Sequence, residues 1–131
     1  MSIVRRNVTY RGRLKVSAGD FSLAKRGTKT CTIRLGIARV DGEVLDLTDG
    51  RRALQVRIVG VQANRTYGQL TDSDALAEGL SSLEELRVDL ERYYGELDSA
   101  QPVTVIHFAL VEEPTVTIPE QATLWGSPRL T

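Results

Sequence analysis

Cysteine and histidine are scarce in this sequence, with one residue of each among 131. A single cysteine forms no disulfide within the chain, which is typical of proteins of the reducing cytoplasm. One histidine and one cysteine cannot supply a nitrogen and sulfur ligand set, so we expect no metal and no cofactor. The apolar runs are far shorter than the roughly 20 residues of a membrane-spanning helix, and no secretion-signal pattern opens the chain. We therefore expect a cytoplasmic protein that does not bind membranes.

Charge is plentiful, and it is unevenly distributed along the chain. Residues 1–57 hold 13 Lys and Arg against 5 Asp and Glu, whereas residues 58–131 hold 4 against 12. The basic half could contact nucleic acid, or the two halves could complement each other within one fold, and charge alone leaves both open. Hydrophobic residues make up 41% of the chain, which at this length favours one globular domain with a modest core.

The first part of the chain predicts short strands and one helix. Mixed β-branched and basic residues at 3–10 and 13–16 are typical of strands. Asp20 is a good N-cap for a helix over 21–26, and Gly27 is a natural end for it.

A hairpin is predicted further along. Asp41-Gly42 is a turn signal, and segments 43–47 and 53–61 flank Thr48-Asp49-Gly50. Apolar and polar residues alternate within the second of these segments, as in a half-buried strand.

Helical signals follow the hairpin. Thr71 caps a short helix over 72–78, with Asp74 completing a capping box. A longer helix over 83–94 places Tyr93 on the same face as three leucines, so we expect Tyr93 in the core.

The last predicted element is an apolar strand over 103–111, introduced by Pro102. Strands that precede and follow a helical pair predict an α+β fold, most simply a small, mostly antiparallel β-barrel with two to three flanking helices. Residues 112–131 contain three prolines and no periodicity, and we expect a C-terminal tail there.

The segment from Lys29 to Arg34 combines a lysine, two hydroxyls and an arginine within six residues. As a strand, it places Thr30, Thr32 and Arg34 on one face. The other face is apolar and belongs in a core; it carries Cys31, Ile33 and Leu35. The polar face could hold an anionic or amide-containing ligand.

Three segments together resemble the ASCH domain family, a branch of the PUA-like superfold. Residues 27–34 are close to that family's G-x-K-T-x-T-I-R signature. Residues 68–79, followed by 82–86, match its short helix, and 102–108 match its closing strand. The resemblance covers residues 20–111.

The resemblance implies a PUA-like domain over 1–111, in which residues 1–19 form an additional N-terminal strand and 112–131 follow as a tail. It implies a small barrel with a cleft between barrel and helices. Members of the family are linked to RNA or to modified nucleosides. Some bacterial members are amidohydrolases that act on N4-acetylcytidine, and others are described as ribonucleases or RNA binders.

In the amidohydrolases, the working residues are a lysine and a threonine of the signature and a glutamate at the end of the short helix. Position by position, these correspond to Lys29, Thr32 and Glu78. Amide hydrolysis would then use Thr32 to attack the acyl carbonyl and Lys29 to take its proton. Glu78 would either hydrogen-bond the cytosine edge or transfer the proton to the leaving amine. Because Lys29 and Thr32 are three residues apart, a regular strand would point them to opposite faces, so Lys29 must lie in the turn before the strand or at a bulge.

Three further residues are candidate ligand contacts. Arg34 suits an oxyanion or a phosphate, Thr30 shares its strand face, and Tyr67 could stack on a base. The alternatives stay open: Arg34 and Glu78 could pair with each other, Tyr67 could pack a loop, and Lys29 could be a solvated turn residue.

A second hypothesis is a non-catalytic RNA-binding module or a ribonuclease that uses the basic half of the chain. Its phosphate contacts would be Arg5, Arg6, Arg11, Arg13, Lys25, Arg26, Arg51 and Arg52. The expected partner is accordingly a modified nucleoside or single-stranded RNA, and a protein partner that docks on the acidic helix 83–94 or on the tail also remains open.

Overall fold

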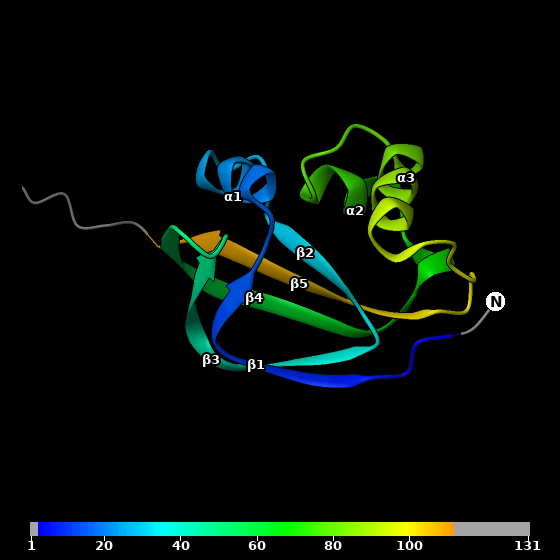
Figure 1. The fold of residues 1–131 in the computed structure, drawn as a ribbon, viewed down its shortest axis with the longest axis horizontal. Helices are drawn as coiled ribbons and strands as arrows, with labels where there is room; N and C mark the ends of the chain where they lie inside the picture. Colours follow the sequence, from blue (N-terminus) through cyan, green and yellow to red (C-terminus); the bar gives the residue numbers. More distant parts are fainter. Residues whose placement is uncertain (1–2, 112–131) are drawn as a thin grey trace, which may run out of the picture.

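A computed structural model describes residues 3–111, and the expected tail over 112–131 lies outside the described residues. Five strands and three α-helices follow one another, with one 3-10 turn between β4 and α2 (Figure 1). In chain order they are β1 (Asn7–Lys15), α1 (Ala18–Lys25), β2 (Cys31–Leu35), β3 (Ile37–Thr48), β4 (Ala53–Thr66), η1 (Tyr67–Gln69), α2 (Asp72–Ala77), α3 (Leu83–Tyr94) and β5 (Pro102–Leu110).

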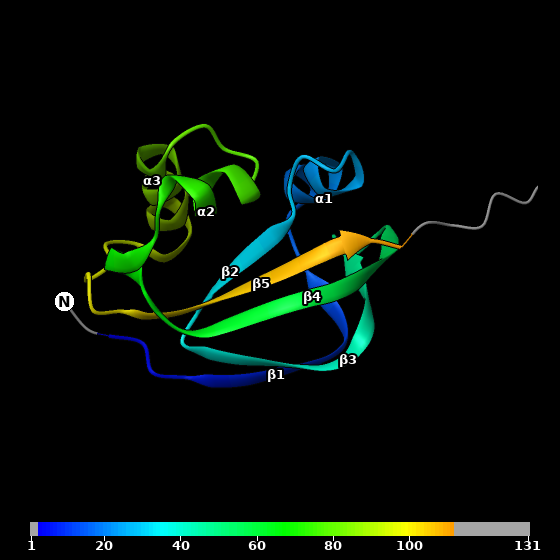
Figure 2. The same ribbon diagram turned by 180° about the vertical axis from the view of Figure 1, so that it is seen from behind.

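The strands form one curled, mixed sheet in the order β1-β3-β4-β5-β2. The pairs β2–β5, β3–β4 and β4–β5 are antiparallel, while β1 and β3 run parallel. All three helices lie over the same side of the sheet, with α1 apart from α2 and α3 (Figures 1 and 2). The α+β class is therefore confirmed, with a mostly antiparallel half-barrel.

Two apolar clusters stabilise this arrangement. One lies between β2, β5 and the helices α2 and α3, and it contains the predicted inward set Cys31, Ile33 and Leu35. The other fills the curl of the sheet and is built from all strands except β2, together with α1. Side chains of β5 contribute to both clusters, because successive residues of a strand point to opposite faces of the sheet.

Helix α1 begins earlier than predicted. Ser17, not Asp20, is its N-cap, and the Ser17 hydroxyl accepts a hydrogen bond from the Asp20 backbone N–H at 3.1 Å. Serine and aspartate are equally good N-caps. Asp20 instead occupies the first turn, where a carboxylate interacts favourably with the helix dipole.

The hairpin of β3 and β4 is confirmed, with Thr48 opposite Ala53. The turn expected at Asp41-Gly42 is wrong, because both residues lie within the continuous strand β3. Gly42 has a φ of 105° there, and the register of β1 against β3 shifts after Asp41. The glycine therefore permits a bend inside a strand instead of a chain reversal.

The N-terminal segments expected at 3–10 and 13–16 form the single strand β1, which starts later, at Asn7. The residues before it are held by the buried Gln101. Its side-chain amide accepts a hydrogen bond from the backbone N–H of Val4 and donates one to the carbonyl of Val4. Gly36, at a φ of 84°, lies against the backbone of Arg6 so closely that a Cβ would collide with the carbonyl oxygen of Arg6.

Helices α2 and α3 begin and end close to the predicted positions. Thr71 and Asp74 form the capping box of α2, and Ser82 caps α3. The expectation that Tyr93 is a core residue is wrong, because its side chain is 60% exposed at the C-terminal end of α3.

Candidate functional site

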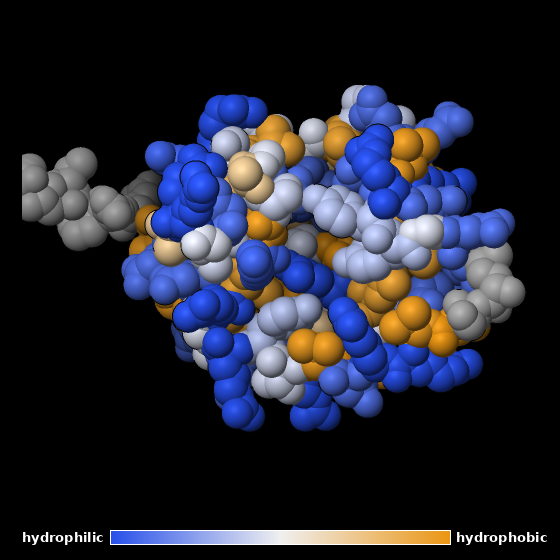
Figure 3. All heavy atoms as spheres, in the orientation of Figure 1, coloured by the Kyte–Doolittle hydropathy of each residue, from blue (hydrophilic) through white to orange (hydrophobic). Residues whose placement is uncertain are grey.

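A cavity of about 330 Å³ opens between α1, α3 and the sheet. The space-filling view shows this face hollowed between the two helices (Figure 3). Its volume is at the lower end of the roughly 300–1,000 Å³ that small-molecule sites occupy. The lining residues are Lys15, Val16, Ser17, Asp20, Lys29, Thr32, Ile33, Arg34, Glu78, Asp89, Leu90, Tyr93 and Tyr94.

Lys29 lies in the turn before β2, which begins at Cys31. Its backbone N–H and that of Thr28 both donate to the carbonyl of Leu23, at the end of α1. The N–H of Thr30 donates to the carbonyl of Ala77 at 2.6 Å, which ties the same turn to α2. Lys29 is thus outside the strand alternation, so it and Thr32 line the same cavity.

Lys29 and Glu78 form a buried ion pair. The Lys29 ammonium donates to Glu78 Oε1, and the two side chains are 1% and 8% exposed. Glu78 is the C-cap of α2, directly next to the residue that holds the Lys29 turn. Burial raises the pKa of the Glu78 carboxyl, and the charges of Asp20 and Asp89 raise it further, although Lys29 opposes the shift. The carboxyl of Glu78 therefore binds a proton more readily than an exposed glutamate does.

Arg34 lines the cavity beside Thr32. Its Nη2 donates to the carbonyl of Lys15 at 2.7 Å, and its guanidinium lies 5.2 Å from the ring centroid of Tyr10. Its Nε is buried and has no hydrogen-bond partner among residues 3–111. Arg34 therefore does not pair with Glu78, the alternative that the sequence left open, and it keeps unused donor capacity at the cavity.

Two candidate contacts lie outside the cavity lining. Thr30 is exposed, and its hydroxyl lies 3.5 Å from the carbonyl of Ala77. Tyr67 is buried against the helices, and its hydroxyl donates to Glu91 Oε2 at 2.5 Å. Burial raises the pKa of the Tyr67 hydroxyl above its usual value, so this residue acts as a packing group with a satisfied polar end.

The cavity lining also includes polar and aromatic side chains that were not among the predicted site residues. Asp20 comes from α1, and Asp89, Tyr93 and Tyr94 come from α3. The ring centroids of the two tyrosines are 6.2 Å apart. The sequence signal that could have indicated Asp89 and Tyr93 was their spacing of three or four residues relative to each other and to the buried Leu90. This spacing places all three on neighbouring parts of one helix face.

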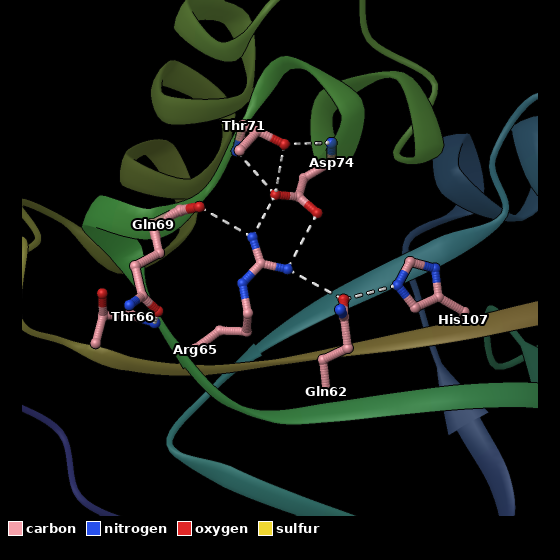
Figure 4. Close-up of polar contacts among 7 residues, drawn as sticks. All are labelled: Gln62, Arg65, Thr66, Gln69, Thr71, Asp74 and His107. Carbon is pink, nitrogen blue, oxygen red and sulfur yellow. Dashed lines mark hydrogen bonds and ion pairs between the residues drawn. The ribbon is translucent and has the colours of Figure 1, made fainter.

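A polar network outside the cavity anchors α2 to β4 (Figure 4). Arg65 Nη2 donates to Asp74 Oδ2 at 2.6 Å and to the carbonyl of Gln69 at 3.0 Å. Gln62 accepts from Arg65 at 3.0 Å and contacts the ring of His107 at 3.0 Å. Because α2 ends at the cavity, this network positions Glu78 from the opposite end of the helix.

The eight basic residues proposed as phosphate contacts are all exposed, and none of them lines the cavity. Arg11 pairs with Asp41 at 3.0 Å and Arg52 with Asp49 at 3.0 Å. The guanidinium of Arg52 also lies 4.5 Å from the ring centroid of Phe21. The basic surface and the cavity are therefore separate features.

Cys31 is fully buried, and burial raises the pKa of its thiol, so the thiol is a packing group and not a nucleophile. Residues 3–111 contain no cluster of three His, Cys, Asp or Glu side chains that could hold a metal ion. In the same range, no helix is long and apolar enough to cross a membrane.

Solved structures share this fold. An ASCH domain from Lactobacillus crispatus JV V101 has a TM-score of 0.56 and 15% identity, over 81% of this chain and 80% of that one. Protein EF3133 from Enterococcus faecalis V583, of the DUF984 family, has a TM-score of 0.54 and 17% identity, over 85% and 79%. The hypothetical protein PH0355 has a TM-score of 0.51 and 16% identity, over 81% and 100%.

The chain therefore has an ASCH-like fold, as its three segments predicted. At sequence identities of 15–17%, the similarity establishes the fold and not the activity. No protein-family model and no curated protein sequence matches the chain.

Proposed function

We propose that the cavity binds an N4-acylated cytidine and hydrolyses its exocyclic amide, with Lys29, Thr32 and Glu78 as catalytic residues. The observation that carries the proposal is the buried ion pair of Lys29 and Glu78 at a cavity that Thr32 also lines. Strongly perturbed, buried ionisable pairs are concentrated at functional sites. A PUA-like barrel with its cleft beside the helices is the architecture that the family resemblance implies.

The first step needs an activated nucleophile. Thr32 Oγ1 attacks the acyl carbon, and its proton passes to the amine of Lys29. That transfer requires Lys29 to be uncharged when Thr32 attacks, and the carboxyl of Glu78, which accepts a hydrogen bond from the amine, is the group positioned to take up its proton. The developing oxyanion needs a donor, and the guanidinium of Arg34 is the available one.

The second step breaks the bond between the acyl carbon and the exocyclic nitrogen. The nitrogen leaves as the cytosine amine after it takes a proton from the Lys29–Glu78 pair. Water then attacks the acyl ester on Thr32, with Lys29 as the base, and releases the carboxylic acid. The products are cytidine and the acid, and Thr32 regains its hydroxyl proton.

The rim of the cavity suits a planar base. Tyr93 and Tyr94 both line it, and their side chains are 60% and 40% exposed. Stacking of a base on an aromatic side chain contributes about 1–3 kcal/mol.

The test is release of cytidine from N4-acetylcytidine, followed by chromatography. Thr32→Val keeps the branched shape and removes the hydroxyl, so turnover should fall by about a thousandfold or more. Thr32→Ser retains a hydroxyl and is the matched control, which should keep measurable turnover. Equal turnover by wild type and Thr32→Val would exclude Thr32 as the nucleophile.

RNA binding is the second proposal, and the exposure of all eight basic residues supports it. Affinity for single-stranded RNA should then fall with rising salt, and the logarithmic slope should decrease by about 0.7 for each phosphate contact removed. Arg5→Gln and Arg13→Gln are suitable changes, because both side chains are exposed. Binding that does not depend on salt would contradict this proposal.

A further inference from the structure

Strand β2 lies at the edge of the sheet and has β5 as its neighbour on one side (Figure 2). The carbonyl of Thr30 accepts a hydrogen bond from the N–H of Phe108 at 3.0 Å. In an antiparallel ladder only every second residue directs its backbone groups at a given neighbour. Thr32 therefore directs its N–H and carbonyl at β5, and the following residue, Ile33, directs its own away from β5.

The free edge of β2 faces the cavity at Ile33. This residue lines the cavity although it is only 4% exposed and its side chain packs in the core between β2, β5 and the helices. The backbone is thus the part of Ile33 that reaches the cavity. No group among residues 3–111 is placed to accept a hydrogen bond from its N–H, because the alternation excludes β5 and β2 has no other neighbouring strand.

Strand β1 does not close this edge by pairing with β2, because the two strands lie at opposite ends of the sheet order. The end of β1 contributes Lys15 and Val16 to the cavity lining. The N–H of Val16 donates to the carbonyl of Thr48 at 2.8 Å, and the carbonyl of Lys15 accepts from the Arg34 side chain at 2.7 Å. A side chain and not a backbone ladder therefore links β2 to β1, and the N–H of Ile33 stays available to a ligand in the cavity.

We propose that the backbone N–H of Ile33 donates to the oxyanion that forms when Thr32 attacks the acyl carbon. The inference deepens the proposed function and rests on it. As the bond from Thr32 Oγ1 to the carbon forms, the carbonyl electron pair moves onto oxygen. The Ile33 N–H stabilises that charge until the pair returns and expels the cytosine nitrogen.

Two features suit the Ile33 N–H to this role. It belongs to the residue directly after the proposed nucleophile, so both groups can reach the same acyl group; in hydrolases of another fold, the N–H at this position takes the same role. It is also fixed in a strand, so it needs no reorganisation when the negative charge develops. The guanidinium of Arg34 is the side-chain donor beside it.

The test removes the N–H of Ile33 and keeps its side chain. Cell-free nonsense suppression replaces Ile33 by its α-hydroxy analogue, which converts the backbone amide into an ester. Removal of one oxyanion donor should lower kcat for N4-acetylcytidine about a hundredfold. The change in KM should stay within about threefold, because the donor acts on the charge of the transition state.

The matched control is the same replacement at Leu35. This residue has the same direction in the strand alternation and is buried in the same core, but it does not line the cavity. Both replacements also weaken the preceding carbonyl, which is directed at β5, so the control measures that effect by itself. Its kcat should stay within about threefold of the wild type, and both variants should melt at similar temperatures.

Three results would overturn the inference and leave the hydrolysis standing: an undiminished kcat in the Ile33 ester variant, an equal loss in the Leu35 variant, or a loss confined to KM. If folded wild-type protein releases no cytidine, the proposed hydrolysis fails and the oxyanion donor fails with it.

Discussion

Replacing Lys29 by methionine tests how the buried ion pair contributes to folding. The change removes the ammonium and leaves the Glu78 carboxyl, 8% exposed, without its partner. Breaking a buried ion pair from one side costs about 3–5 kcal/mol, because an uncompensated charge remains in the interior. This is a large share of the roughly 5–15 kcal/mol that stabilises a typical domain. At roughly 4 °C per kcal/mol, Tm should fall by about 12–20 °C.

The dependence on pH has a definite sign. Burial holds the pKa of Glu78 above its usual value, so the folded protein retains a proton that the unfolded chain loses first. Stability is therefore greatest below the unfolded pKa of the carboxyl and decreases as the pH rises toward the folded value. Without the opposing charge of Lys29, this decrease should extend to higher pH in Lys29→Met.

Two further variants make the result decisive. In Lys29→Met/Glu78→Leu both charges are gone, so most of the lost stability should return. Lys25→Met, at the exposed end of α1, should stay within about 0.5 kcal/mol of the wild type. Urea unfolding followed by far-UV circular dichroism measures all three. A loss below about 1 kcal/mol in Lys29→Met, or a double variant no more stable than the single one, would show that the ion pair does not stabilise the fold in this way.

Two other substitutions test how the fold supports the site. Gly36→Ala should destabilise the protein by about 2 kcal/mol or more, because φ is 84° and the new Cβ would collide with the carbonyl of Arg6. Thermal melting should show no comparable loss in the control Gly60→Ala, where no atom lies within 4 Å of the new Cβ. In the wild type, burial raises the pKa of Asp74, but the hydrogen bonds from Arg65 and Thr71 and the charge of Arg65 together outweigh it and hold the pKa below its usual value. The hydrogen-bonded Asp74 carboxylate stabilises the fold above its unfolded pKa, and this stabilisation is lost as the pH falls. Arg65→Met should therefore reduce the slope of the unfolding free energy against pH on the acid side. Curves of equal slope for Arg65→Met and wild type would contradict this role.

Local sequence signals predicted the helical part of the fold well. Thr71 is the predicted cap of α2 and occupies it in the structure, and α3 spans Leu83–Tyr94, the predicted range. Capping depends on hydrogen bonds within a few residues, so neighbouring residues suffice to predict it. The competition between Ser17 and Asp20 for the cap of α1 was not decided by local chemistry, because both residue types serve equally well.

Long-range pairing could not be predicted in the same way. The parallel pairing of β1 and β3 and the bend at Gly42 depend on which strands become neighbours. The network of Arg65, Gln62 and His107 joins residues up to 45 positions apart, and no local pattern indicates it. Strand β4 continues to Thr66, well beyond the predicted end at residue 61, because its far end pairs with the start of β5.

The candidate site, like the fold, was predictable from the sequence only in part. The resemblance proposed Lys29, Thr32 and Glu78, and the structure places all three at one cavity. Asp20 and Asp89 carry no motif, and only the packing of α1 and α3 around the cavity brings their charges together. The acidic residues of the cavity thus come from elements whose relative position the sequence does not reveal.

We propose above that Thr32, activated by the Lys29–Glu78 pair, cleaves an acyl amide. The most direct test of this proposal is to incubate wild type, Thr32→Ser and Thr32→Val with N4-acetylcytidine and to follow the release of cytidine by chromatography. We predict release by the wild type, reduced release by Thr32→Ser and none above background by Thr32→Val. Undiminished release by Thr32→Val, or no release by folded wild-type protein, would contradict it.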